Sequence, residues 1–139
     1  MTRYLGIDFG QKRIGLAISD ENGQIAFPLC VLENCGQRRV AVEISRIVTE
    51  RKVGALVLGL PLNLDGSKGI AVENVEKFTD ILKQYISIPV EFWDERLSTK
   101  IAERAMIEGG LSRMRRKQSI DQATAQIILQ SYLDAHAKV

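Results

Sequence analysis

Residues 5–10 read LGIDFG, an apolar strand pattern that one carboxylate, Asp8, interrupts. A glycine turn, the cations Lys12 and Arg13, and a second apolar run at 14–20 follow directly. An unpaired carboxylate buried in such a strand would cost several kcal/mol or would be held neutral. Asp8 therefore needs a partner, and a metal ion, alone or with a bound phosphate, is the natural candidate.

The pattern around this stretch predicts an α/β fold. Residues 3–9, 14–20 and 25–33 have the composition of strands, and the turn before the third ends in the hairpin signal Asn22-Gly23. We therefore expect a three-strand antiparallel meander. Helical periodicity then predicts a helix over 38–51, and the wholly apolar run at 55–58 predicts a strand covered on both faces.

The second half of the chain alternates helices with strands. Ser67 is expected to cap a helix, and residues 88–93 are expected to form a fifth strand. Ser98 or Thr99 should cap a further helix that ends at Gly109-Gly110. Ser119 opens a capping box and starts the last helix. The expected buried stripe of that helix is Ile120, Ala123, Thr124, Ile127, Ile128 and Ser131. The order βββαβαβαα predicts a mixed five-stranded sheet, in which two parallel strands join the meander and helices flank the sheet.

Length and composition are those of one ordinary domain spanning residues 1–139. An apolar content of 45% and a charged content of 26% are typical of a soluble globular protein with a full core. No apolar run approaches the roughly 20 residues of a membrane span, and we expect no signal peptide. We expect a cytoplasmic protein without a membrane partner, a monomer or weak homodimer, in which Cys30 and Cys35 are free thiols. The net charge of +2 is too small to indicate nucleic-acid binding, so local clusters must decide that question.

Carboxylates fall at the ends of three predicted elements. Asp8 ends the first strand, Asp94 and Glu95 follow the fifth, and Asp121 lies in the first turn of the last helix. Sites in open α/β sheets form beyond the carboxyl ends of parallel strands, so Asp8 and Glu95 should emerge at one edge, where the last helix can add Asp121. Such oxygen donors suit Mg²⁺ or Mn²⁺. Two such ions roughly 3.5–4 Å apart would support phosphodiester cleavage.

These carboxylates also have purely structural interpretations. Asp121 would complement the helix macrodipole if it lay in the first turn. Asp94 and Glu95 would be part of a solvated loop with a local ion pair to Arg96. Asp8 is different, because a carboxylate at the end of an apolar first strand is more often functional than structural.

Basic residues flank the predicted carboxylates. Lys12 and Arg13 follow Asp8, and a basic stretch precedes the last helix. That stretch contains Arg113, Arg115, Arg116 and Lys117. Cations at the rim of a metal site would offset the repulsion between carboxylates and a phosphate backbone, and the alternative is a solvated surface.

Other polar and aromatic residues near the predicted site have two interpretations each. Arg96 would bind phosphate or pair with Asp94, and Asn63 would contact phosphate or cap its turn. Trp93 is expected in the core rather than stacked on a base. His136 is expected at the surface, without a partner.

Four motifs, taken in order, resemble the YqgF/RuvX family. They are GIDFGQKRIGLA at 6–17, GLP at 59–61 with Asn63 and Gly66, DERLST at 94–99, and DQATAQIILQ at 121–130. The resemblance covers essentially the whole chain. It implies an RNase H-like fold and a metal-dependent nuclease that matures the 5′ end of precursor 16S rRNA in the bacterial cytoplasm, as part of ribosome biogenesis. By motif match, Asp8, Glu95 and Asp121 would be its acidic catalytic and metal-binding residues.

One position departs from the pattern of the resolvase relatives. These usually carry a carboxylate at the end of the fourth strand, where this chain has Gly59-Leu60-Pro61. Glu95, one strand along, is the first candidate to substitute for it, and Asp65 in the following loop is a weaker one.

Other functions are compatible with these residues. A Holliday-junction resolvase acting on branched DNA would use the same chemistry, as a dimer. Gly-x-Asp-x-Gly also opens the phosphate loop of actin-like ATPases and sugar kinases, although those proteins need two such domains. A non-catalytic RNA-binding module would use the basic rim alone, although three carboxylates without metal would repel phosphate.

Overall fold

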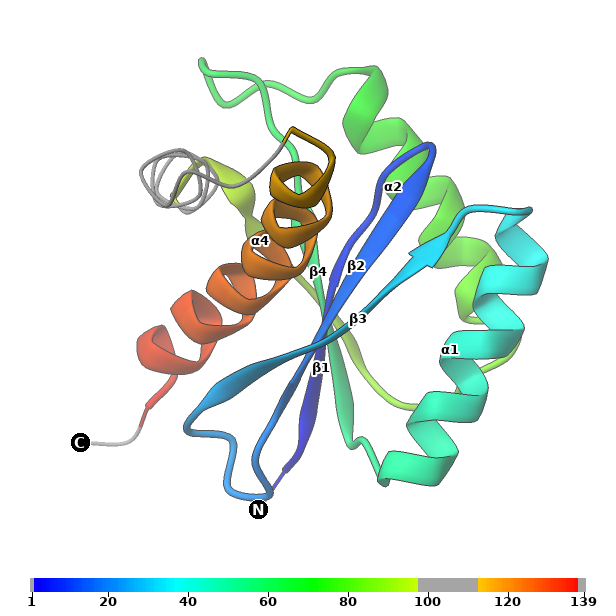
Figure 1. The fold of residues 1–139 in the computed structure, drawn as a ribbon, viewed down its shortest axis with the longest axis vertical. Coiled ribbons are helices and arrows are strands. Elements are labelled where there is room, and N and C mark those ends of the chain that lie inside the picture. Colours follow the sequence, from blue (N-terminus) through cyan, green and yellow to red (C-terminus); the bar gives the residue numbers. More distant parts are fainter. Residues whose placement is uncertain (1, 98–112, 138–139) are drawn as a thin grey trace.

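A five-stranded sheet lies between two layers of helices in the computed structural model (Figure 1). The structure describes residues 2–97 and 113–137, and side chains within 2–96 and 123–137. The elements are β1 (Tyr4–Asp8), β2 (Arg13–Ser19), β3 (Ala26–Glu33), α1 (Gln37–Arg51), β4 (Ala55–Leu60), α2 (Ile70–Leu82), β5 (Val90–Asp94), the 3₁₀ turn η1 (Glu95–Leu97) and α4 (Arg113–Ala135). Among these residues, no helix is long and apolar enough to cross a bilayer. The helix expected over 98–110 lies outside the described residues.

The strand order is β3-β2-β1-β4-β5. β2 runs antiparallel to β1 and β3, whereas β4 runs parallel to β1 and β5. The predicted meander followed by two parallel strands is therefore confirmed. Since β1, β4 and β5 point the same way, their carboxyl ends meet at one edge of the sheet.

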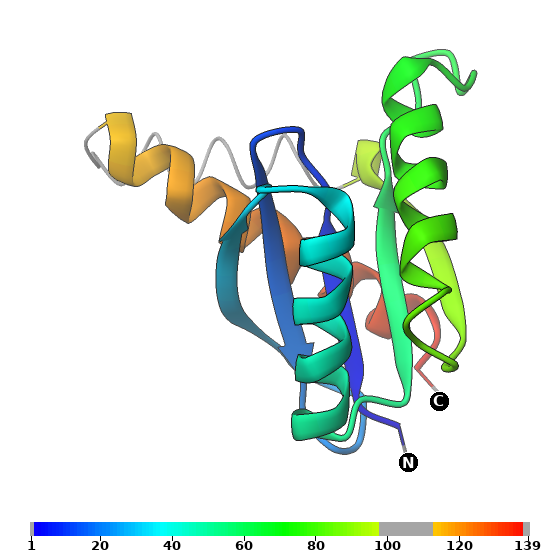
Figure 2. The ribbon, with the colours of Figure 1, turned by 90° about the vertical axis from the view of Figure 1, so that its right-hand side faces the viewer.

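Helices cover both faces of the sheet. α4 packs on β1, β2 and β3 on one face, and α1 and α2 lie side by side on the other (Figure 2). Alternation along β4 explains its wholly apolar sequence, because Leu56 and Leu58 join the core beneath α1 and α2 while Val57 joins the core beneath α4. On β1, a Cβ at Gly6 would lie 2.8 Å from the Cβ of Leu129, so glycine lets α4 approach the central strand.

The last helix begins at Arg113, and the predicted start at Ser119 is wrong. The arginines, lysine and glutamine of 113–118 are good helix formers, and no glycine or proline separates them from the rest. Asp121 therefore lies about two turns inside the helix. The macrodipole explanation for Asp121 is therefore also wrong, because the favourable interaction with the helix dipole is limited to the first turn.

The buried stripe of α4 is rotated from the predicted one by about one residue. Its buried members are Thr124, Ala125, Ile128, Leu129, Tyr132 and Leu133. Of the predicted members, Thr124 and Ile128 are buried, Ala123, Ile127 and Ser131 are only half-buried, and the side chain of Ile120 lies outside the described ones. This part of the helix is apolar over more than one face, so periodicity alone does not predict which face is buried. The close approach of Leu129 to Gly6 determines that face.

The predicted cap of α2 is also wrong. The helix begins at Ile70 after Gly69, and no side chain caps it. The N–H and the Oγ of Ser67 instead donate to Oδ1 of Asp65, at 2.9 and 2.6 Å. Ser67 therefore closes the preceding loop rather than starting the helix.

Candidate active site at the carboxyl edge of the sheet

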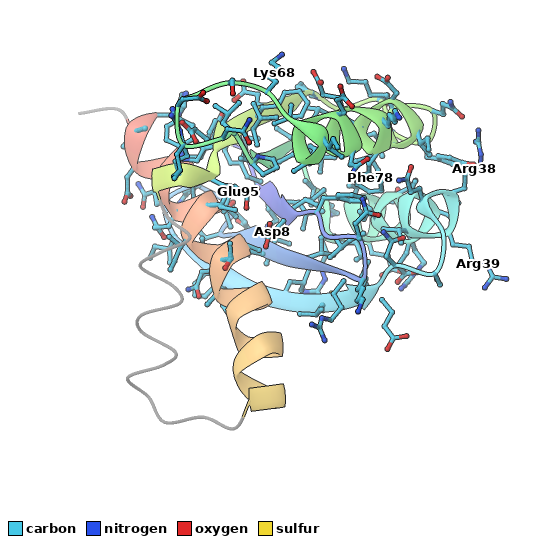
Figure 3. The ribbon with its side chains drawn as sticks, turned by 90° about the horizontal axis from the view of Figure 1, so that it is seen from above. Asp8, Arg38, Arg39, Lys68, Phe78 and Glu95 are labelled. Atoms are coloured by element: carbon cyan, nitrogen blue, oxygen red, sulfur yellow. The ribbon has the colours of Figure 1, made fainter. Side chains whose placement is uncertain are left out.

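Two carboxylates that are 87 positions apart in sequence lie together at the carboxyl edge of the sheet. Asp8 ends β1, and Glu95 opens η1 directly after β5. Both line a cavity of about 280 Å³, whose other walls include Pro61 after β4 and Ala71 and Asn74 on α2. Figure 3 shows the two side chains close to one another at this edge. The parallel pairing of β1, β4 and β5 is what brings them together.

Glu95 reaches this cavity across Gly59, near the end of β4. A Cβ on Gly59 would lie 2.7 Å from Cγ of Glu95 and 2.9 Å from its Cδ, well inside the roughly 3.5–4.0 Å of ordinary carbon contacts. The Glu95 side chain thus fills the space that a side chain at position 59 would take. Asp65, the weaker candidate for the missing carboxylate, is exposed and is not among the residues that line the cavity.

The electrostatics of the pair suit a bound cation. Burial raises the pKa of Glu95, and the negative charge of Asp94 raises it further. The hydrogen bond between the side chains of Glu95 and Asp8 lowers the pKa of Glu95 and so partly opposes this shift. Two carboxyl groups held this close, one of them largely buried, either share a proton or bind a positive ion. Their oxygens are the hard donors that Mg²⁺ and Mn²⁺ prefer, so the residues present fit a divalent metal.

The third predicted carboxylate, Asp121, lies on α4, but its side chain is outside the described ones. The first turns of α4 lie at the same edge of the sheet as the end of β1 (Figure 1). Among the side chains that the structure describes, no group of three or more His, Cys, Asp or Glu residues is placed to hold a metal ion. Asp8 and Glu95 are therefore the part of the predicted triad that the structure brings together.

The predicted cations fall in two places. Lys12 and Arg13 lie on the β1–β2 hairpin and line a neighbouring cavity of about 350 Å³, together with Glu33 and Cys35. Gln11 lines both cavities. The basic stretch 113–117 belongs to the first turns of α4, and its side chains are outside the described ones.

Two of the open alternatives have a structural answer. The Nε and Nη2 atoms of Arg96 donate to the Asp94 carboxylate at 2.9 and 2.7 Å, and the Arg96 guanidinium holds the pKa of Asp94 below its ordinary value. Arg96 therefore pairs with Asp94. Asn63 caps its own turn, since its Nδ2 donates to Oγ of Ser67 at 3.0 Å.

An aromatic cluster lies away from the carboxylates. Trp93 is half-buried, as the predicted core position requires, and its Nε1 donates to Oγ of Ser131 at 3.0 Å. The prediction that His136 lacks a partner is wrong, because its ring stacks on Tyr132 at a centroid distance of 4.1 Å. Trp93 also meets the His136 ring edge-on.

Sequence reasoning missed the cavity wall. Ala71 and Asn74 occupy an exposed turn of α2 that carries no motif, so nothing in the sequence marks them. Pro61 belongs to the GLP motif, which contributes to the family resemblance but does not by itself mark a cavity wall. Gly59 leaves space for Glu95 only because β5 pairs with β4, and sequence periodicity does not predict which strands pair.

A mixed sheet with β1 at its centre, helices on both faces and carboxylates at its carboxyl edge defines an RNase H-like fold. T. thermophilus RuvC in complex with a Holliday junction substrate matches it with a TM-score of 0.58 at 17% identity, covering 97% of this chain and 95% of that chain. The fowlpox virus resolvase in complex with Holliday junction DNA matches with a TM-score of 0.57 at 13% identity, covering 98% and 99%. These likenesses confirm the predicted fold.

The chain belongs to the RuvX family, described as Holliday junction resolvase, whose pattern matches residues 2–135. A Myxococcus xanthus relative is 44% identical over 134 residues, covering 96% of this chain and 89% of the relative. A Clostridioides difficile relative is 44% identical over 132 residues, covering 95% and 94%. Both carry the name "Putative pre-16S rRNA nuclease". The family resemblance noted in the sequence is confirmed.

Proposed function

We propose that this protein is a divalent-metal-dependent nuclease that hydrolyses phosphodiester bonds at the 5′ end of precursor 16S rRNA in the cytoplasm. The observation that carries the proposal is the Asp8–Glu95 pair in one cavity at the carboxyl edge of the sheet. The names of the two relatives, at 44% identity, support precursor rRNA as the substrate.

In this proposal, Asp8, Glu95 and Asp121 hold Mg²⁺ or Mn²⁺, with two ions in the complete site. Bound ions of this kind activate a water molecule and stabilise the leaving oxygen. β1 and η1 fix Asp8 and Glu95, and Gly59 leaves the room in which Glu95 is held. Pro61 and Ala71 line the same cavity as the two carboxylates.

The phosphate backbone is held, in this proposal, by cations around the cavity rather than inside it. Lys12 and Arg13 stand on the hairpin next to Asp8, and the first turns of α4 carry the second cluster. That cluster consists of Arg113, Arg115, Arg116 and Lys117. Their charge offsets the repulsion between the carboxylates and the substrate until metal is bound.

The test compares end-labelled precursor 16S rRNA with four-way junction DNA as substrates, with and without Mg²⁺ or Mn²⁺. Asp8→Asn and Glu95→Gln should each lower metal-dependent RNA cleavage more than a hundredfold, because several kcal/mol of charge stabilisation is lost. Asp80→Asn is the matched control, since Asp80 is an exposed carboxylate on α2 that does not line the cavity. It should cleave like the wild type.

Three outcomes contradict the proposal in different ways. Unchanged cleavage by Asp8→Asn, in preparations free of contaminating nuclease, removes the assigned site. Preferential cleavage of junction DNA favours a resolvase. Metal-independent RNA binding without any cleavage favours a binding module.

A further inference from the structure

A loop with internal backbone hydrogen bonds lies beside the carboxylate cavity. Residues 61–69 join β4 to α2, and within them the N–H of Asn63 donates to the carbonyl of Ser67 at 2.9 Å. The N–H of Gly66 donates back to the carbonyl of Asn63 at 2.8 Å, with φ at +87°, a conformation that favours glycine. The loop therefore has its own fixed shape, and its first residue, Pro61, lines the cavity together with Glu95.

Arg96 links this loop to the strand end that carries Glu95. While Nε and Nη2 bind the Asp94 carboxylate, Nη1 donates to the carbonyl of Leu64 at 3.4 Å. The guanidinium also lies close over Gly66, where a Cβ would be 3.4 Å from Nη1. One planar side chain thus contacts both sides of the gap between η1 and the loop.

Asp94 binds both the backbone and the side chain of Arg96. Its Oδ1 accepts the backbone N–H of Arg96 at 2.9 Å, which caps the start of η1, the turn that holds Glu95. The same carboxylate accepts the side chain of Arg96, so the position of Glu95 and the position of the guanidinium depend on one group.

We propose that Arg96 is a positioning residue, which together with Asp94 clamps the 61–69 loop to η1, the turn that opens with Glu95, and that it does not bind the phosphate backbone. The clamp stands on geometry alone, and its effect on cleavage rests on the proposed nuclease function. A phosphate would have to displace a bidentate carboxylate whose charge already neutralises the guanidinium. Lysine should not replace Arg96, because it lacks the planar fork whose separate nitrogens reach the carboxylate and the carbonyl.

The first experiment measures amide hydrogen exchange in the loop, which does not depend on catalysis. Arg96→Lys and Asp94→Asn should each speed exchange at Gly66 and Ser67 by about tenfold or more, while exchange in β1 and β4 is unchanged. Lys68→Gln is the matched control, because it removes an exposed cation from the same loop without touching the clamp. It should leave loop exchange as in the wild type.

The second experiment separates positioning from phosphate binding on precursor rRNA. A lost clamp should lower kcat by roughly ten- to hundredfold with KM and the salt dependence of RNA binding unchanged. In Arg96→Gln, which removes the charge that lysine would keep, a lost phosphate contact would instead raise KM and reduce the slope of log affinity against log salt by about 0.7–0.9. Asp94→Asn sharpens the contrast, since it frees Arg96: a phosphate-binding arginine would then bind RNA more tightly, whereas a clamp loses kcat as in Arg96→Lys.

The clamp is overturned if Arg96→Lys and Asp94→Asn both exchange like the wild type, or if the charge-removing variant Arg96→Gln changes the salt slope at an unchanged kcat. If the wild type cleaves neither RNA nor DNA, the proposed function fails, and loop exchange still decides whether Arg96 holds the loop.

Discussion

Gly59→Ala should disable the site while leaving the fold in place. The added methyl group would lie 2.7 Å from Cγ of Glu95, 2.9 Å from its Cδ and 2.8 Å from Cδ1 of Ile128. Ordinary carbon contacts need roughly 3.5–4.0 Å, so neighbours must move by about 1 Å. Ile128, on α4, is fully buried, whereas Glu95 borders the open cavity. We therefore expect the Glu95 side chain to be the one that moves.

The magnitudes follow from this geometry. Overpacking costs about 1–3 kcal/mol, and removing a glycine from a strand returns roughly 0.5–1 kcal/mol. We therefore expect a net loss of about 1–2 kcal/mol in unfolding free energy, seen as a drop of several degrees in Tm. A carboxylate displaced by about 1 Å should lower kcat by roughly a hundredfold.

Gly54→Ala is the matched control, because its Cβ would lie 2.8 Å from Cγ2 of Thr2, just before β4, and would meet neither the carboxylates nor α4. It should lower Tm and keep kcat when assayed well below that Tm. A double-mutant cycle adds a test without catalysis: in a Glu95→Ala background, Gly59→Ala should cost less stability, because only the Ile128 contact remains. Wild-type kcat in Gly59→Ala, or an equal kcat loss in Gly54→Ala, would refute the reasoning.

Three further outcomes are expected. The amide oxygen of Gln130 accepts the N–H of Ala26 at 2.8 Å, so Gln130→Ala should lose about 1–3 kcal/mol in urea unfolding, because it leaves a part-buried donor unpaired. The pKa of Asp20 is lowered because its carboxylate accepts the N–H groups of Ile25 and Gln24. Its stabilisation is complete above the ordinary value of 3.8 and is lost as pH falls through the lower folded-state value, so Asp20→Asn should flatten the acid side of a Tm-against-pH curve. Burial raises the pKa of the half-buried Cys30, so iodoacetamide followed by peptide mass spectrometry should find the exposed Cys35 alkylated first, and equal rates would contradict the placement of Cys30.

Local patterns predicted most of the architecture because each element carries its own signal. The meander follows from short alternating runs and an Asn-Gly turn, and the strand at 55–58 follows from an unbroken apolar run. Errors arose where two local signals compete. Ser119 resembles a cap, yet the helix-forming residues before it extend α4 back to Arg113.

By itself, the sequence determined that Asp8 ends an apolar strand, that acidic residues follow the fifth strand, and that no carboxylate ends the fourth. Only the tertiary structure decided which of these groups meet. Parallel pairing of β1, β4 and β5 brings Asp8 and Glu95 to one cavity, and the bare backbone of Gly59 gives Glu95 its room. The tertiary structure also shows that Arg96, a candidate phosphate ligand in the sequence, binds Asp94 and the carbonyl of Leu64. These outcomes depend on contacts between strands and loops far apart in the chain, and a local pattern holds no information about such distances.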